Sequence, residues 1–207
     1  MYLPPHFKPH DESHALALMR EHPLANLISQ DEEGAPYVSH LPLHLQQRDA
    51  DIFLQGHCAR ANPHWRYLQA RPHALVTFMG PQAYLSPKVY PDLARVPTWN
   101  YLAVHARVEA TLIDSTTDKD ALLKALIADH EPAYAEQWRG LDGAFQDRML
   151  NGIVAFELRI TDLQCKLKLN QHRASSLAAL YAMYAQGSPQ EQALAGWMVR
   201  LGLVAQP

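Results

Sequence analysis

A short run of unlike polar and aromatic side chains, residues 96–101 (Val-Pro-Thr-Trp-Asn-Tyr), is the part of the sequence best suited to binding a ligand. It places a hydroxyl, an indole, an amide and a phenol side by side where a strand is predicted to begin. Burying so many hydrogen-bonding groups in a core strand without partners would be costly. A ligand or a partner subunit would satisfy these groups. A solvated loop leading into a strand is the other interpretation.

Two further segments carry groups suited to an anion. Asn62 followed by Pro63 predicts a helix start, because Asn accepts from free backbone N–H groups and proline fits the first helical position. Arg60 then lies two residues before a helix N-terminus, where a guanidinium and unpaired N–H groups can converge on phosphate oxygens. Lys166 and Lys168 are two apart, so a strand points both the same way. For Arg60 the structural alternative is an ordinary capped helix with a surface arginine. For the lysines it is a basic strand edge that prevents aggregation.

Composition limits the classes of protein to consider. The chain has 207 residues, 48% of them hydrophobic and 19% charged, which is typical of a soluble globular protein. The formal net charge of −3 gives no global attraction to nucleic acid, so direct DNA binding would need a local basic patch. Cys58 and Cys165 lie far apart, which argues against a disulfide scaffold or a zinc ribbon. With no run of eighteen apolar residues, we expect a cytoplasmic protein that is neither exported nor membrane-inserted.

The twelve histidines raise the question of a metal site. They form no H-E-x-x-H motif and no closely spaced Cys/His cluster. His40 and His44 would share a strand face, and His57 and His64 are seven apart, so a site assembled in space stays open. The sequence itself predicts no metal ligand.

The elements that must position these groups are mostly strands. Alternation is strictest after residue 103, where Val104, Ala106 and Val108 share one face and His105 and Arg107 share the other. Asp11 is predicted to cap a helix that Pro23 ends. Strands are predicted at 24–29, 36–45, 51–55, 74–79, 83–85 (after a turn at Gly80-Pro81), 103–112 and 153–161, with helices after Pro63, at 118–130 and around 144–150.

Two apolar helical stripes end the chain and are separated by Gly187-Ser188-Pro189. They could be taken for a DNA-binding helix-turn-helix. From residue 174 to 207, however, the only Lys or Arg is Arg200, against Glu191. A helix meant for the major groove needs several phosphate and base contacts. The pair is therefore interpreted as a packing or dimerisation hairpin.

Taken together and in this order, the motifs resemble the PaiB-like family of FMN-binding negative transcriptional regulators. The resemblance covers most of the chain. It departs from the family pattern at Asn170, where serine is expected, at His172, where asparagine is expected, and at Val108, near a usual glycine. The blocks that carry it are Met1-Tyr2-Leu3-Pro4 with Phe7, His40-Leu41-Pro42, residues 56–63, residues 83–87, residues 96–101 with Val104-His105, and Lys166 to Gln171.

The resemblance implies a fold class: α+β and mainly β, an antiparallel split β-barrel of the pyridoxamine-phosphate-oxidase type with covering helices and a C-terminal helical hairpin. It implies a homodimer with FMN near the subunit interface. We expect residues 1–170 to form the FMN-binding barrel domain and residues 171–207 a helical extension packed on the barrel or on the dimer partner.

The resemblance also implies a set of FMN ligands. Arg60 and Lys168, with Lys166 or Arg173 as further candidates, suit the phosphate. Trp99 or Tyr84 suits a wall for the isoalloxazine. Thr98, Asn100 and Gln171 suit hydrogen bonds to the ring edge or ribityl chain. The cofactor-binding residues predicted on this basis are Arg60, Asn62, Tyr84, Thr98, Trp99, Asn100, Lys168 and Gln171.

Three functions remain open at this level. The first is the family's regulatory role, with DNA as a partner implied by the resemblance and unsupported by the net charge. The second is an FMN-dependent oxidoreductase resembling flavin reductases, in which the flavin carries the electrons and His105 or Tyr84 delivers a proton. The third is a haem-binding or metal-binding barrel, favoured only by the histidine count. No catalytic residue is assigned.

Overall fold

The computed structural model describes residues 1–92 and 94–205. Leu93, within the predicted loop 86–95, and Gln206 and Pro207, at the end of the predicted helical extension, lie outside the described residues.

Strands of the described chain form one seven-stranded sheet in the order β2-β1-β5-β6-β7-β4-β3. The pairs β1–β2, β1–β5, β3–β4 and β4–β7 are antiparallel. Most strands that follow one another in sequence are neighbours in the sheet, but β2 and β3 lie at its two edges. The strands are β1 (Leu24–Gln30), β2 (Pro36–Pro42), β3 (His44–Arg48), β4 (Asp51–Ala59), β5 (His73–Leu85), β6 (Thr98–Ile113) and β7 (Ile153–Lys168).

Helices interrupt the run of strands in four groups along the chain: α1, α2, α3 to α5, and α6 with α7. Ser13 N–H donates to Asp11 Oδ1 over 2.8 Å, so Asp11 does cap the first helix, as predicted. Ser188 forms a capping box with Glu191 at the start of the last helix. The helices are α1 (Ser13–Glu21), α2 (His64–Ala70), α3 (Thr116–His130), α4 (Tyr134–Gly140), α5 (Gly143–Asn151), α6 (Leu177–Ala185) and α7 (Pro189–Arg200), with 3₁₀ turns at Pro5–Phe7, Pro87–Val89 and Ala174–Ser176.

The chain divides into two compact units, each described separately. Unit 1 comprises residues 1–18, 79–104 and 164–207. Unit 2 comprises residues 19–78 and 105–163. The long strands β5, β6 and β7 contribute residues to both. The domain boundary predicted at residue 170 stays a prediction.

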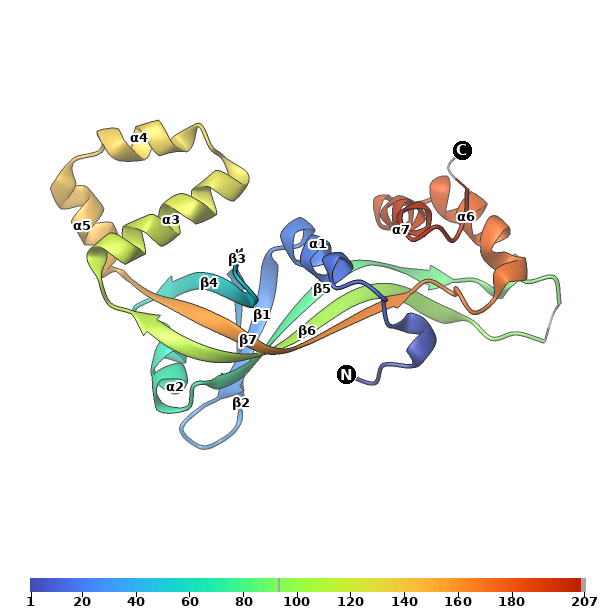
Figure 1. Cartoon of the computed structure of the whole chain (residues 1–207), viewed down its shortest axis with the longest axis horizontal. Helices are drawn as coiled ribbons and strands as arrows, with labels where there is room; N and C mark the ends of the chain where they lie inside the picture. The colour runs from blue at the N-terminus through green and yellow to red at the C-terminus, as the bar shows by residue number, and fades with distance from the viewer. Residues whose placement is uncertain (93, 206–207) are drawn as a thin grey trace. The chain divides into compact units, whose positions relative to one another are not determined.

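Each unit has its own buried apolar groups. In unit 1, α6 and α7 bury Leu180, Tyr184, Leu194 and Met198 completely. Figure 1 draws this hairpin on one side of the strands and the N-terminal segment on the other. In unit 2, Leu122 and Leu126 of α3 pack with Ala155 of β7 and Ile113 of β6. The helices α3 to α5 follow one another beside the strands of this unit (Figure 1).

The predicted fold class, an α+β antiparallel split barrel with covering helices and a C-terminal helical hairpin, is confirmed. The strand predicted over 36–45 is two strands, because the chain bends at Leu43. Leu43 N–H donates to Pro23 O over 3.0 Å, and its side chain fills the space that Gly56 leaves. The closing strand continues beyond 161 to Lys168, and α4 was not predicted.

The turn predicted at Gly80-Pro81 was wrong, because β5 runs unbroken from His73 to Leu85. Gly80 serves a close approach instead. A Cβ there would lie 2.5 Å from Leu18 Cδ1 and 3.2 Å from Leu102 Cβ. The glycine therefore lets α1 pack against the strand.

Replacing Gly80 with valine should destabilise the fold by about 1–3 kcal/mol, because the added methyl groups meet Leu18 and Leu102. Urea unfolding measures the change as a lower midpoint. Gly196→Ala is the matched control: no atom lies within 4 Å of a Cβ there, and alanine in a helix should stabilise by about 0.5–1 kcal/mol. Equal midpoints for Gly80→Val and the wild type would contradict the close packing.

Candidate functional site

Two lysines near the end of β7 form the centre of the candidate site. Lys166 and Lys168 project to one face, while Leu167 and Leu169 on the other face are buried, as the alternation predicted. Lys166 is only 7% exposed and its Nζ donates to the Tyr2 carbonyl over 3.1 Å. This ammonium group is thus held inside unit 1 by a neutral acceptor.

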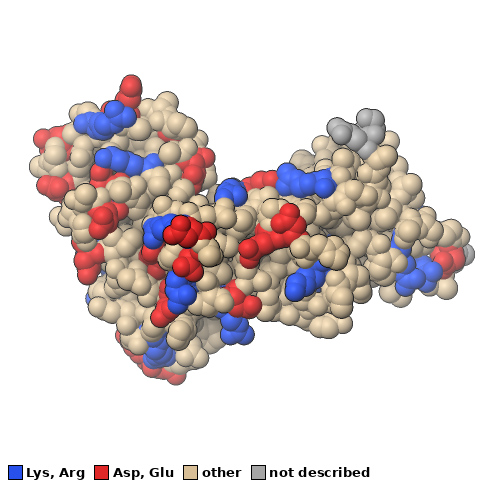
Figure 2. All heavy atoms as spheres, in the orientation of Figure 1, with Lys and Arg blue, Asp and Glu red and all other residues tan. Residues whose placement is uncertain are grey.

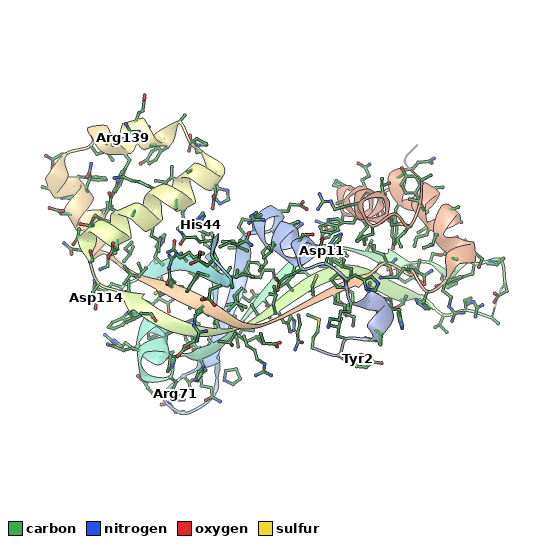
Figure 3. The ribbon with its side chains drawn as sticks, viewed as in Figure 1. Tyr2, Asp11, His44, Arg71, Asp114 and Arg139 are labelled. Carbon is green, nitrogen blue, oxygen red and sulfur yellow. The ribbon has the colours of Figure 1, made fainter. Side chains whose placement is uncertain are left out.

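Aromatic rings surround the Lys166 ammonium. Its Nζ lies 5.5 Å from the ring centroid of Tyr2, 5.8 Å from that of Phe7 and 5.2 Å from that of Tyr101. Figure 3 labels Tyr2 in the N-terminal segment, on the side of the strands away from α6 and α7. Ring faces attract cations at these distances. The N-terminal segment is therefore part of the site.

Lys168 extends the same group of side chains. Its Nζ donates to Thr98 Oγ1 over 2.7 Å and lies 5.8 Å from the Tyr101 ring. Burial, together with the positive charge of Lys166, lowers the pKa of Lys168. Within the described chain, neither ammonium group is hydrogen-bonded or ion-paired to a carboxylate. We call Lys166, Lys168, Thr98, Tyr101, Tyr2 and Phe7 the lysine cluster.

Two histidine rings also lie in this region. The rings of His6 and His172 lie 4.8 Å apart, and Phe7 lies 5.5 Å from His172. Burial lowers the pKa of His172, and His6, Arg173 and Lys168 lower it further. Each of these effects disfavours protonation of His172. A bound anion nearby would favour it.

Tyr84 and Trp99 present exposed aromatic surface in the same unit. Their ring centroids lie 6.5 Å apart at 81°, and the two residues are 49% and 53% exposed. Trp99 and Tyr101 are two apart on β6, so they share a face of the strand. The face that carries Tyr101 of the lysine cluster thus also carries the exposed indole.

Asn100 lies on the opposite face of β6. It is fully buried, and its Nδ2 donates to the Tyr184 hydroxyl of α6 over 3.1 Å. The Tyr184 hydroxyl donates to the Tyr84 carbonyl over 3.3 Å, and burial raises the pKa of Tyr184 to about 12. Asn100 Oδ1 has no hydrogen-bond partner. The structure therefore uses Asn100 to hold the helical hairpin and does not bring it to the lysines.

The turn after β7 uses the amides of Asn170 and Gln171. Gln171 Oε1 accepts from Leu169 N–H over 2.9 Å, and its Nε2 donates to Leu167 O over 2.6 Å. Asn170 has a φ of +63°, which asparagine tolerates better than most residues, and it accepts from the Tyr90 hydroxyl over 3.1 Å. These amides shape the backbone that carries the lysines.

Arg60 and Asn62, the remaining predicted ligands, belong to unit 2. Arg60 Nε donates to Asn151 O over 2.7 Å and its Nη2 to Ile153 O over 3.2 Å, so the guanidinium caps the end of α5. Asn62 Oδ1 accepts from His64 N–H over 3.0 Å, so the predicted helix start is confirmed, although Pro63 is the N-cap and α2 begins at His64. Both side chains thus have structural partners.

A closed polar network surrounds His64 in unit 2. The ring is 1% exposed, with Nε2 2.9 Å from Ser29 Oγ and Nδ1 2.8 Å from Ser39 Oγ. Asn62 Nδ2 donates to Ser39 Oγ over 3.0 Å. The network joins β1, β2 and α2, and burial lowers the pKa of His64 to about 4.

Of the predicted ligands, the structure brings together Thr98 with Lys168, and Tyr84 with Trp99. The predicted set left out Tyr2, Phe7 and Tyr101, although all three stand in the sequence blocks that carry the family resemblance. Sequence spacing could not show that the N-terminal segment folds over the lysines. Among the described residues, no three or more His, Cys, Asp or Glu side chains gather as a metal site. None of the described helices is long and apolar enough to span a membrane.

Comparison with known proteins identifies relatives of the chain. Residues 1–162 match the family model described as a putative FMN-binding domain. Protease synthase and sporulation protein PAI 2 of Bacillus subtilis (strain 168) is 33% identical over 178 residues, which span 84% of this chain and 83% of that protein.

Solved structures share the fold at low sequence identity. Flavocytochrome Anf3 of Azotobacter vinelandii has a TM-score of 0.61 and 18% identity, over 78% of this chain and 69% of that one. An FAD and heme binding protein of Mycobacterium smegmatis has a TM-score of 0.60 and 18% identity, over 78% and 73%. At these identities the likeness concerns the fold alone.

The His64 network predicts a dependence of stability on pH. With a folded pKa of about 4 and an ordinary value of 6.5, His64 binds protons more readily in the unfolded chain between these two values. Its contribution to stability is therefore complete above pH 6.5 and falls by up to about 3 kcal/mol as the pH drops to 4. Urea unfolding of the wild type and of His64→Gln over this range measures the effect.

The His64→Gln variant should show a flatter pH profile and a lower stability at pH 7, because Ser29 and Ser39 lose their hydrogen bonds to the imidazole ring. His10→Gln, at an exposed position, is the control and should follow the wild type. Parallel profiles for His64→Gln and the wild type would exclude His64 as the source.

Proposed function

Because the chain belongs to the family of putative FMN-binding domains, we propose that it binds FMN and that the lysine cluster holds the FMN phosphate. Membership agrees with the resemblance to PaiB-like proteins and supports a flavin as the class of cofactor. The choice of FMN among flavins is part of the proposal. The observation that carries it is that, in the part of the chain that the structure describes, the ammonium groups of Lys166 and Lys168 pair with no carboxylate.

The donor set fits a phosphate monoester. Such a group is close to doubly negative and accepts several hydrogen bonds. Lys166 and Lys168 supply two charges, and Thr98 adds a hydroxyl 2.7 Å from Lys168 Nζ. Their present acceptors are a carbonyl and that hydroxyl, both neutral. A phosphate would therefore replace weak acceptors with a charged one.

The exposed rings suit the other end of a flavin. An isoalloxazine is a flat aromatic plate, and offset or edge contacts with aromatic side chains stabilise it. Trp99 and Tyr84 supply such surface, and each is about half exposed. A bound flavin supplies electron transfer. In this proposal Trp99 and Tyr84 bind and orient the flavin, while Asn100 and Gln171 hold the backbone of the same unit in place.

For the biological role, we propose a cytoplasmic homodimer that acts as a negative regulator of transcription, as the family resemblance implies. Charge is unevenly distributed: unit 1 has seven Lys and Arg against four Asp and Glu, a net of +3, and unit 2 has eleven against seventeen, a net of −6. A contact with nucleic acid would therefore involve unit 1. The alternative is a flavin-dependent oxidoreductase, favoured by aromatic surface that a small substrate can reach.

Replacing Lys168 with methionine should weaken FMN binding about tenfold or more, because a hydrogen bond between charged groups is lost. Binding of riboflavin, which lacks the phosphate, should change little. Fluorescence titration with both flavins measures the two affinities. Lys8→Met, at an exposed position of the same unit, is the matched control.

Equal losses of FMN and riboflavin would show that Lys168 does not read the phosphate. Arg60→Ala tests the other candidate. If that variant alone lost FMN selectively, the phosphate would belong with Arg60 and the lysine cluster would be excluded.

Regulator and oxidoreductase are separated by two assays on the flavin-loaded protein. A regulator should enrich a defined sequence from a random duplex library, with an affinity that falls steeply with salt. An oxidoreductase should consume NADPH in proportion to its bound flavin. Enrichment without NADPH consumption would reject the oxidoreductase, and the opposite result would reject the regulator.

A further inference from the structure

A cavity of about 510 Å³ lies in unit 2, between α3 and strands β3, β4, β6 and β7. Its volume falls within the range of small-molecule sites, roughly 300–1,000 Å³. All of its lining residues belong to unit 2, and none is among the predicted flavin ligands.

The floor of the cavity is a fixed polar network. Arg48 makes a two-pronged contact with Glu157, with Nη1 3.0 Å from Oε1. Gln55 Nε2 donates to Glu157 Oε2 over 2.8 Å, and Arg48 Nε donates to Gln46 Oε1 over 2.9 Å. The one Lys or Arg side chain of the lining is therefore neutralised by protein groups. No positive charge is left over for an anionic ligand.

Two carboxylates of the lining have no such partner. Within the described chain, the side chains of Asp114 and Asp118 make no hydrogen bond or ion pair. Figure 3 shows Asp114 where β6 leads into α3, and His44 toward the other end of that helix. The charges of Glu157 and Arg48 cancel, so Asp114 and Asp118 give the lining a net charge of −2 when His44 is counted as neutral.

The electrostatic surroundings have the same sign. Unit 2 carries a net charge of −6, although Figure 2 shows basic as well as acidic side chains over the helices α3 to α5. His44, the remaining basic group of the lining, points its Nδ1 to Asp129 Oδ2 at 2.6 Å. Both the cavity and its unit thus attract cations.

Another part of the lining, which we call the α3 wall, is apolar. Ala121, Leu122 and Ala125 of α3 line it, with Ile113 at the end of β6. A strongly hydrated metal ion would gain nothing from such a wall. A ligand with a hydrocarbon body would bury apolar area there, at roughly 25 cal/mol per Å².

We propose that this cavity binds a small organic cation, an amine or an amidine with a compact apolar body. The charged head lies toward Asp114 and Asp118, and the body lies against the α3 wall. The amides of Gln46 and Gln55 are set by their bonds to Arg48 and Glu157, so they offer fixed polar contacts. The inference is independent of the flavin proposal.

Three probes of similar shape and different charge test the proposal. Benzamidine is a cation, benzamide is neutral and benzoate is an anion. Two-dimensional NMR titration of the full chain gives both affinity and location. Benzamidine should bind with shifts at Ala121, Leu122 and Gln55, benzamide at least fivefold more weakly, and benzoate not at all. Equal affinity for benzamidine and benzamide would overturn the charge argument, and shifts confined elsewhere would overturn the site.

Variants separate the carboxylates from general charge. Asp114→Asn and Asp118→Asn should each weaken benzamidine binding about threefold to fivefold. Asp147→Asn, an equal change at an exposed position of α5, should leave it unchanged. Ala121→Phe, at an exposed position of the wall, should fill the cavity and abolish binding. Wild-type affinity in both aspartate variants, or in Ala121→Phe, would reject the proposal.

Discussion

In unit 1 the ammonium groups of Lys166 and Lys168 lie near each other, and among the described residues no carboxylate pairs with either of them. Burying an unpaired charge costs several kcal/mol even after relaxation. The three rings around Lys166 return about 0.5–2 kcal/mol each at best, and the Tyr2 carbonyl and Thr98 hydroxyl add neutral hydrogen bonds. Protein groups alone therefore compensate only part of the charge. An anion with several acceptor oxygens, such as the phosphate proposed above, would complete the balance.

Strand alternation explains how one motif serves two purposes. On β6, Trp99 and Tyr101 face one side and Asn100 faces the other. The first side carries an exposed indole and the ring beside both lysines. The second holds α6 through Tyr184. A dense run of polar and aromatic residues thus indicates function and architecture together, and only the face on which each residue lies separates the two.

The sequence carried enough information for the fold class and for part of the site. The alternation of apolar and polar residues after residue 103, and the spacing of Lys166 and Lys168, are local patterns. The two-residue period of a strand was therefore enough to predict which side chains share a face. The predictions at Gly80 and Leu43 were wrong because no local pattern determines the backbone there. Their conformations follow from Leu18 and Gly56, which lie far away in sequence and act through packing. A Gly-Pro pair can therefore mark a turn, or, as at Gly80, a position where a neighbouring helix packs too closely for a Cβ.

Arg60 shows the same limit for function. Its position before a helix is suited to a phosphate, yet two backbone carbonyls, one at the end of α5 and one at the start of β7, accept hydrogen bonds from the same donors. An isolated arginine offers the same chemistry to a carbonyl as to an anion, and only the fold decides between them. The lysine cluster differs because its two charges lie together and no carboxylate of the described chain pairs with them.

Net charge describes this chain poorly, because the two units have opposite signs. An overall charge of −3 is the sum of +3 in unit 1 and −6 in unit 2. Electrostatic interactions between exposed charges are screened within about 10 Å in ordinary buffers, so a ligand responds to its own surroundings and not to the total. A phosphate near the lysine cluster and a cation beneath α3 are therefore compatible within one chain. The low charge that argues against nucleic acid for the whole protein does not bear on a ligand as small as either of these.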